Sequence, residues 1–265
     1  MHEGDGAMAL LETRFDSQIL DLSLGVNVIL PEHPQAWVTP PAVLYLLHGL
    51  SDDHTIWSRR TAIERYAADY NLAVVMPDAY KSFYCNMAHG SDYRVFLSDE
   101  LPMLINRWFN VSADPEWTFV AGMSMGGYGA MKLALDNPGK YAAAASICGA
   151  LDIAAHINDD WDTSRRRTFE AVFGDLNAVP GSGNDLIARL EALDLIPGTE
   201  LFVCVGREDY LYQDSATFRD AAAARGFRLT YEESTGGHDW DFADLQIQRV
   251  LEWLPIEKLP CVTNE

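Results

Sequence analysis

A serine between two glycines, Gly122-Met123-Ser124-Met125-Gly126, is the part of this chain with the clearest chemical meaning. The mostly apolar residues before it predict a short buried strand, and the small residues after it predict the start of a helix. This strand–turn–helix context is typical of a nucleophile elbow, which exposes a serine hydroxyl above the edge of a sheet. The pattern predicts a catalytic serine at a helix N-terminus, where free N–H groups stabilise negative charge.

A serine hydroxyl needs a base to take its proton, and His238 is the candidate for that base. Of the seven histidines, only His238 follows the last predicted strand, in a glycine-containing loop over residues 235–239. Serine first and histidine last is the order of the α/β-hydrolase triad. His48 follows an earlier strand, and we interpret it as a structural residue of its own loop.

The third member of such a triad is a carboxylate that orients the imidazole. Glu208 and Asp209 both lie directly after the predicted strand that ends at Val205. Adjacent side chains point in different directions, so only one of the two can face the histidine. We predict Asp209, with Glu208 as the alternative, and interpret Asp239 as a cap of the final helix.

Acyl transfer also requires donors for the oxyanion of the tetrahedral intermediate. The backbone N–H of Met125, directly after the serine, is one predicted donor. The second is the N–H of Leu50, in the loop that follows the apolar run ending at Leu47, where Gly49 permits a close backbone approach. The two donors together form a predicted oxyanion hole.

A small apolar acyl pocket is predicted beside these residues. Four bulky side chains near the strand ends are candidates for its walls: Trp57, Tyr84, Met123 and Trp240. A small slot gains binding from each methylene only while room remains, so we expect acyl groups from acetyl to butyryl. Residues 150–200 are predicted to form a cap-like insertion that is charged in its middle, unlike the apolar lid of a lipase.

The elements that must position these residues alternate between strands and helices. The predicted strands have their apolar parts at residues 18–20, 26–30, 43–47, 72–76, 118–121, 141–148, 201–205 and 228–231. The predicted helices cover residues 61–70, 99–109, 125–137, 185–193, 215–225 and 239–254. This alternation predicts an α/β fold with a mostly parallel central sheet flanked by helices, whose chemistry gathers at the carboxyl ends of the strands.

Composition limits the other possibilities. With 265 residues, 48% of them hydrophobic, the chain suits one domain over residues 1–265, and we expect residues 1–7 to be disordered. A net charge of −20 argues against nucleic acid and anionic membranes as partners. No apolar run is long enough to span a bilayer, and the acidic N-terminus is unlike a secretory signal.

The sequence contains no motif typical of a metal or cofactor site. The four cysteines match no metal or redox spacing, which favours the reducing cytoplasm as the compartment. The cluster of Asp52, Asp53 and His54 has neither a calcium-loop nor a zinc-site spacing. No glycine-rich dinucleotide motif follows a first strand, so we expect no cofactor.

With these residues placed, the chain resembles the esterase D-like family of α/β-hydrolases, and especially its small bacterial tributyrin esterases. The resemblance covers most of the chain from Leu10 to Pro255. It rests on residues 25–28, 44–50 with Trp57, 74–77, 100–102, 122–129, 206–212 and 237–240. It implies the α/β-hydrolase fold, a Ser124–Asp209–His238 triad and a homo-oligomer, either a dimer or a tetramer.

The resemblance implies a serine carboxylesterase for short-chain acyl esters that needs no cofactor. The alternatives are an S-formylglutathione-type thioesterase, or a carbohydrate acetyl or feruloyl esterase with the same triad. S-formylglutathione hydrolases look like Ser-Gly-Leu-Thr-Cys at the oxyanion loop, whereas residues 48–52 here read His-Gly-Leu-Ser-Asp. A catalytically silent scaffold on the same fold is a further alternative.

Overall fold

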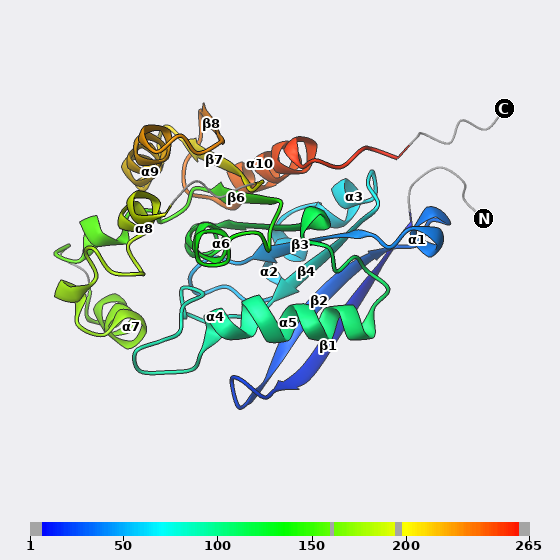
Figure 1. Ribbon diagram of the computed structural model, residues 1–265, viewed down its shortest axis with the longest axis horizontal. Coiled ribbons are helices and arrows are strands. Elements are labelled where there is room, and N and C mark those ends of the chain that lie inside the picture. The colour runs from blue at the N-terminus through cyan, green and yellow to red at the C-terminus, as the bar shows by residue number, and fades with distance from the viewer. Residues whose placement is uncertain (1–6, 160–161, 194–197, 260–265) are drawn as a thin grey trace.

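The computed structural model describes residues 7–159, 162–193 and 198–259, and an eight-stranded sheet forms its centre (Figure 1). The strands lie in the order β1-β2-β4-β3-β5-β6-β7-β8. β2 pairs antiparallel with β1 and β4, and every other neighbouring pair is parallel. The strands are β1 (Met8–Ser17), β2 (Leu22–Pro31), β3 (Ala42–Leu47), β4 (Leu72–Pro77), β5 (Thr118–Met123), β6 (Ala143–Ile147), β7 (Glu200–Gly206) and β8 (Leu229–Ser234).

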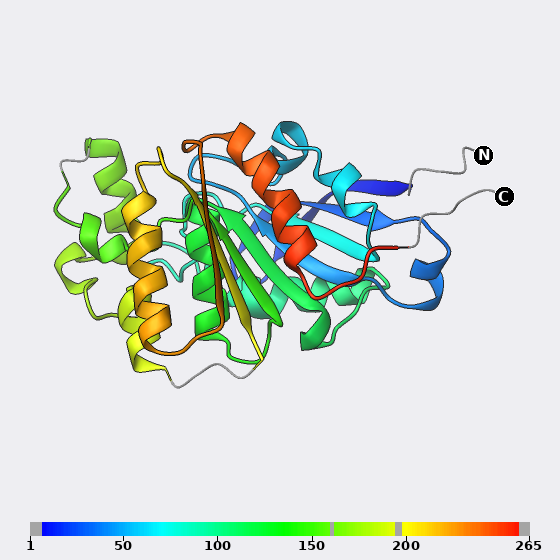
Figure 2. The same ribbon diagram turned by 90° about the horizontal axis from the view of Figure 1, so that it is seen from above.

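Helices cover both faces of this sheet (Figure 2). One face packs against α2 (Ile56–Arg60), α3 (Ile63–Ala67) and α10 (Trp240–Trp253). The other packs against α4 (Tyr93–Val95), η1 (Phe96–Glu100), α5 (Leu101–Trp108), α6 (Met125–Asp136), α8 (Leu186–Ala192) and α9 (Tyr212–Ala224). The remaining elements are α7 (Thr163–Phe173) and the short α1 (Gln35–Val38), η2 (Pro115–Trp117), η3 (Ile153–His156) and η4 (Leu176–Ala178).

Strand β3 shows how the sheet divides the core into two layers. Val43, Tyr45 and Leu47 pack into the layer with α5 and α6, whereas Leu44 and Leu46 pack into the layer with α10. Successive side chains of a strand point to opposite faces, so a strand covered on both sides reads as a continuous apolar run. This double burial fixes the end of β3, from which the predicted oxyanion loop leaves.

Most predicted strands are confirmed, but the one placed around residues 18–20 is wrong. β1 ends at Ser17, and residues 18–21 form the turn to β2. The buried carboxylate of Glu100 accepts the N–H of Gln18 at 2.7 Å and the hydroxyl proton of Ser17, and the Ser17 Oγ accepts the N–H of Leu20 at 3.0 Å. These side chains satisfy the backbone donors that a strand would have used, so the chain turns there.

The predicted helix over residues 61–70 is shorter in the structure, since α3 spans Ile63–Ala67. Of the segment that we expected to be disordered, residues 1–6 lie outside the described residues. Ala7 is described, and its carbonyl accepts the N–H of Glu32 at 2.9 Å. Among the described helices, none combines the length and apolar character needed to cross a membrane.

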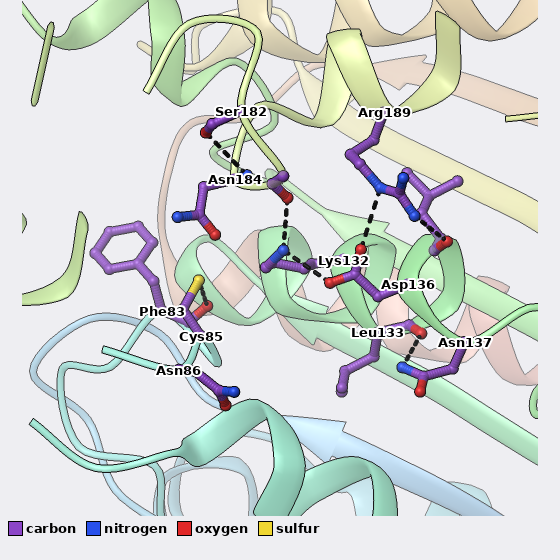
Figure 3. Close-up of polar contacts among 12 residues, drawn as sticks. Phe83, Cys85, Asn86, Lys132, Leu133, Asp136, Asn137, Ser182, Asn184 and Arg189 are labelled. Carbon is purple, nitrogen blue, oxygen red and sulfur yellow. Dashed lines mark hydrogen bonds and ion pairs between the residues drawn. The ribbon is translucent and has the colours of Figure 1, made fainter. Parts of the chain in front are cut away.

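The segment between β6 and β7 is fastened to α6 by charged side chains, of which Lys132 is buried (Figure 3). Nζ of Lys132 on α6 donates to the carboxylate of Asp136 at 2.8 Å and to the carbonyl of Gly183 at 2.7 Å. Arg189 on α8 donates from Nε to the same Asp136 carboxylate at 3.2 Å and from Nη2 to the carbonyl of Leu135 at 3.1 Å. The helix that begins at the predicted nucleophile is therefore fastened to this segment at two points, Gly183 and Arg189.

Candidate active site

Ser124 lies at a tight turn between β5 and α6, with φ +58° and ψ −116°. A positive φ is costly for a residue with a side chain, and such strain is frequent at functional sites. The flanking glycines permit the turn. A Cβ on Gly122 would lie 2.5 Å from the backbone of Gly126, and a Cβ on Gly126 would lie 2.3 Å from the carbonyl oxygen of Leu47. The structure thus has the strand–turn–helix geometry that the sequence predicts.

His238 and Asp209 form a hydrogen-bonded pair. Nδ1 of His238 lies 2.9 Å from Oδ2 and 3.1 Å from Oδ1 of Asp209, so the imidazole donates to the carboxylate. The Asp209 side chain is buried, and its Oδ1 also accepts the N–H of Leu211 at 2.7 Å. Burial acts to raise the pKa of the Asp209 carboxyl, but hydrogen bonds from His238, the Cys148 thiol and Leu211 outweigh it and hold that pKa below its ordinary value. Asp209 is therefore a stable anion that fixes the tautomer of His238.

The carboxylate of Glu208 contacts the backbone of Gly236 and not His238. This carboxylate accepts the N–H of Gly236 at 2.6 Å, and the N–H of Glu208 donates to the carbonyl of Gly236 at 3.1 Å. A Cβ on Gly206 would lie 2.0 Å from that same carbonyl oxygen, so the loop carrying His238 lies directly against the end of β7. Asp239 caps α10 by accepting the N–H of Phe242 at 2.8 Å. Of the two candidate carboxylates after β7, Asp209 is the one in contact with His238.

The two predicted oxyanion donors lie beside Ser124. Leu50 and Met125 both line the cavity that contains Ser124, and neither N–H has an acceptor within the described part of the chain. Gly49 is close enough to Ser124 that a Cβ added to it would lie 3.8 Å from the serine Cβ. His48 holds this loop, because its Nε2 accepts the N–H of Ala79 at 3.0 Å and its Nδ1 donates to the Gly49 carbonyl at 2.8 Å.

A cavity of about 500 Å³ opens in front of Ser124 and His238. Met123 and Trp240 line it, as predicted, but Trp57 and Tyr84 do not. Both rings are fully buried, and each donates to the backbone of the predicted oxyanion loop or of the strand before it. Trp57 Nε1 donates to the carbonyl of Leu47 at 3.0 Å, and the Tyr84 hydroxyl donates to the carbonyl of His48 at 2.7 Å. Their assignment to the pocket wall was wrong, since buried aromatic polar groups take partners in the core.

Several cavity residues were not predicted from the sequence. The segment between β6 and β7 contributes Ile153, His156, Asp159, Arg165 and Phe169, and Phe83 lies beside them. Tyr210 is exposed, and its ring centroid lies 4.6 Å from that of His238. Its position next to Asp209 was the one available signal. The residues of the segment between β6 and β7 line the cavity because that segment folds back over the sheet, and no sequence pattern indicated which of its residues would do so.

His156 is clamped between two carboxylates at the cavity wall. Its Nε2 lies 2.8 Å from Asp214 and its Nδ1 2.6 Å from Asp159. The hydrogen bond to Asp214 is the largest cause that raises the pKa of His156 to about 9, against the effect of burial. His156 is therefore an imidazolium at neutral pH, and both of its ring nitrogens donate.

One group of side chains in the described residues has the composition of a metal site: Cys148, Asp209 and His238, whose donor atoms all lie within 4.8 Å of one another. A thiol must be deprotonated to bind a metal. Burial and then the charge of Asp209 raise the pKa of the Cys148 thiol, so it stays protonated. The cluster is better described as a hydrogen-bonded group than as a ligand set.

Comparison with known proteins agrees with this geometry. Residues 17–247 match the family model described as putative esterase. The chain is 30% identical over 261 residues to an acetyl esterase of Caldicellulosiruptor saccharolyticus, with 93% of this chain and 98% of that protein covered.

Two solved structures from Staphylococcus aureus are similar over 94% of this chain and 99% of theirs, each at 33% identity. One is FphF, a fluorophosphonate-binding serine hydrolase, with a TM-score of 0.87. The other is the S-formylglutathione hydrolase FrmB, with a TM-score of 0.83. A ferulic acid esterase at 21% identity, with a TM-score of 0.81, supports the fold. The chain thus belongs to the putative esterase family and is an esterase with the α/β-hydrolase fold.

Proposed function

We propose that this esterase is a serine carboxylesterase that hydrolyses short-chain acyl esters through an acyl-enzyme intermediate. The observation that carries the proposal is the strained turn at Ser124, which lines the same cavity as an imidazole paired with a buried carboxylate. Ser124 is the nucleophile, His238 the general base and Asp209 the group that orients the base.

The reaction proceeds in two halves. His238 Nε2 takes the proton of the Ser124 hydroxyl as the oxygen attacks the ester carbonyl, and the N–H groups of Leu50 and Met125 stabilise the oxyanion. The tetrahedral intermediate collapses when the imidazolium gives its proton to the departing alcohol, which leaves an acyl-serine. Water, activated by the same histidine, then attacks the acyl group and releases the acid.

The cavity favours a short acyl group. Met123, Phe83, Ile153 and Trp240 supply apolar surface, whereas the segment between β6 and β7 adds the charged groups of His156, Asp159 and Arg165 to the same cavity. A long acyl chain would have to pass these charges, and desolvating them is costly. The test is kcat/KM over p-nitrophenyl esters from two to sixteen carbons, with the maximum expected at two to four. A maximum at long chains would contradict the proposal.

Ser124→Ala is expected to lower kcat by roughly 10⁴-fold or more, since a triad without its nucleophile loses covalent catalysis. The variant should also lose labelling by a fluorophosphonate probe while keeping the unfolding temperature of the native protein. Labelling that persists in Ser124→Ala would place the nucleophile elsewhere and reject the assignment. A folded native protein that takes no label would instead favour a silent scaffold.

The thioesterase alternative uses the same machinery and is supported by the similarity to FrmB. The native protein distinguishes the two when S-formylglutathione is compared with p-nitrophenyl acetate. We expect the oxygen ester to have the higher kcat/KM, because Asp52 lines the cavity at the position where the glutathione enzymes look like cysteine. A much higher value for S-formylglutathione would promote the alternative.

We further propose that the protein works in the reducing cytoplasm. Cys85, Cys148 and Cys204 are buried free thiols, and Cys261 lies outside the described residues. Buried thiols in a protein without described disulfides are typical of a reducing compartment. Cell fractionation with an antibody to the protein tests the location.

A further inference from the structure

The end of β6 and the loop after it contact the backbone of the Ser124 turn and of strand β7. Ser124 donates its N–H to the carbonyl of Ile147 at 2.9 Å, and its own carbonyl accepts the N–H of Ala150 at 3.2 Å. Between these two contacts, Cys148 donates its N–H to the carbonyl of Cys204 on β7 at 2.9 Å. The segment over residues 147–150 therefore links the nucleophile turn with the strand that ends before Asp209.

Cys148 is an unusual residue at this position. Its φ is +49°, in the left-handed region that favours glycine, and its side chain is fully buried. Its sulfur lies within 4.8 Å of the ligand atoms of both Asp209 and His238. A side chain at a strained backbone position, aimed at two triad residues, needs an explanation beyond filling space.

The Asp209 carboxylate has room for one more donor. Its Oδ1 accepts the N–H of Leu211, and both oxygens lie near Nδ1 of His238. A carboxylate accepts up to about four hydrogen bonds, so Asp209 has the capacity for a further donor. The Cys148 sulfur lies within 4.8 Å of this carboxylate, and its thiol is protonated and can only donate to an anion.

We propose that Cys148 is a positioning residue for the triad, whose S–H donates to the Asp209 carboxylate and keeps it aimed at His238. The proposal rests on the proposed function, since it names a residue that acts through that triad. Cys148 neither touches the substrate nor enters the chemistry. Its part is to add a further donor to those around Asp209.

The test compares Cys148→Ala, Cys148→Ser and Cys148→Gly in the full chain. Alanine and glycine delete the donor, and glycine does so without the positive-φ cost, so it provides a folded variant if alanine does not. Both should lower kcat about tenfold or more with KM within about twofold, the loss expected of one hydrogen bond to a charged group. Serine, which keeps a donor, should recover most of the loss.

The pH dependence of kcat/KM distinguishes a positioning role of Cys148 from a role in packing alone. Without the thiol donor, the Asp209 charge is less neutralised and holds a protonated imidazole more strongly. The acid limb of kcat/KM should therefore move to higher pH in Cys148→Ala and return in Cys148→Ser. An unmoved limb together with a kcat within twofold of the native value would overturn the proposal.

Cys204→Ala is the matched control. Cys204 is also a buried thiol, one strand away, but its Sγ faces the carbonyl of Ser146 at 3.7 Å instead of a carboxylate. It should lose stability with kcat unchanged. An equal loss of kcat in Cys204→Ala, or a Cys148→Ser variant worse than Cys148→Ala, would reject a role specific to the Asp209 contact.

A readout without substrate keeps this proposal distinct from the proposed function. The Nδ1 proton of His238 gives a downfield NMR resonance when it donates to a carboxylate, and its chemical shift should change in Cys148→Ala but not in Cys204→Ala. This result holds whichever ester the protein hydrolyses. An inactive native protein would reject the function, whereas an unchanged resonance in Cys148→Ala would reject the positioning role alone.

Discussion

At the residue scale, Glu208 and Asp209 are adjacent in the sequence, yet their carboxylates have different surroundings and different partners. Asp209 is buried against His238, whereas Glu208 is exposed and holds the backbone of Gly236. The first residue orients the imidazole directly. The second stabilises the loop that carries it, so the two should differ in what their loss does to catalysis.

Asp209→Asn is expected to reduce kcat by roughly a thousandfold or more, because an amide donor facing Nδ1 stabilises the wrong imidazole tautomer. Glu208→Gln retains an oxygen acceptor for the N–H of Gly236 and should stay within about tenfold of the native kcat. Steady-state kinetics of the two variants decide the assignment. A larger loss in Glu208→Gln would make Glu208 the triad acid.

The positions of Ser124, Asp209 and His238 could be predicted from the sequence because each lies after a predicted strand. Ser124 directly follows β5, whereas Asp209 and His238 lie in short loops after β7 and β8. The pocket could not be predicted in the same way. Trp57 and Tyr84 are close to strand ends in the sequence, yet their polar atoms bind backbone carbonyls behind the cavity. Phe83 and Tyr84 both have positive φ, at +50° and +57°, and no residue preference predicts two such side-chain-bearing residues in succession.

At the element scale, α7 shows the same limit. Its residues Phe169 and Phe173 are four apart and so lie on one helix face, which the sequence can indicate. Which surface that face meets is decided by long-range contacts. The rings pack against Phe83, at centroid distances of 5.0 and 5.5 Å, far away in the sequence. No helix was predicted over Thr163–Phe173, so both α7 and its neighbours were missed, whereas most strands and the longer helices elsewhere in the chain were predictable.

The docking of the segment between β6 and β7 onto α6 depends on an ion pair in which Lys132 is buried. Lys132→Met leaves Asp136 with the partly exposed Arg189 as an ionic partner but removes the donor to the Gly183 carbonyl, and we expect a loss of about 1–3 kcal/mol in unfolding free energy. Arg166 and Glu170 form a pair with the same four-residue spacing on α7, but both are exposed. Arg166→Met should cost less than about 1 kcal/mol. Urea unfolding of both variants measures the difference, and equal losses would contradict a structural role for burial of Lys132.

The clamp on His156 predicts how stability depends on pH. Because folding raises the pKa of His156 from 6.5 to about 9, its stabilisation is fully present below pH 6.5 and is lost as the pH rises through about 9. The native protein should therefore exceed His156→Gln in unfolding free energy most at pH 6, and the gap should close by pH 10. Denaturation at several pH values tests this, and a gap that widens with pH would refute it.

At the scale of the whole molecule, charge is the dominant feature. The chain carries 39 acidic and 19 basic residues, and a net charge of −20 repels itself in the compact state. Salt screens such repulsion over distances beyond about 10 Å at 0.1 M. We expect the melting temperature to rise between 10 mM and 0.5 M NaCl, as measured by calorimetry. A falling melting temperature would show that attractive ion pairs outweigh the repulsion.

The order of strands across the sheet has a consequence for biosynthesis. Ser124 follows β5 at the middle of the sheet, but Asp209 follows β7, and His238 comes after β8 at the far edge. Translation proceeds from the N-terminus, and the early part of a chain can fold first. A nascent chain in which the turn at Ser124 has already formed is still inactive, because its proposed base, His238, has not yet been synthesised. Catalytic competence thus arrives only with the closing portion of the chain, and the appearance of fluorophosphonate reactivity during translation would time the completion of the fold.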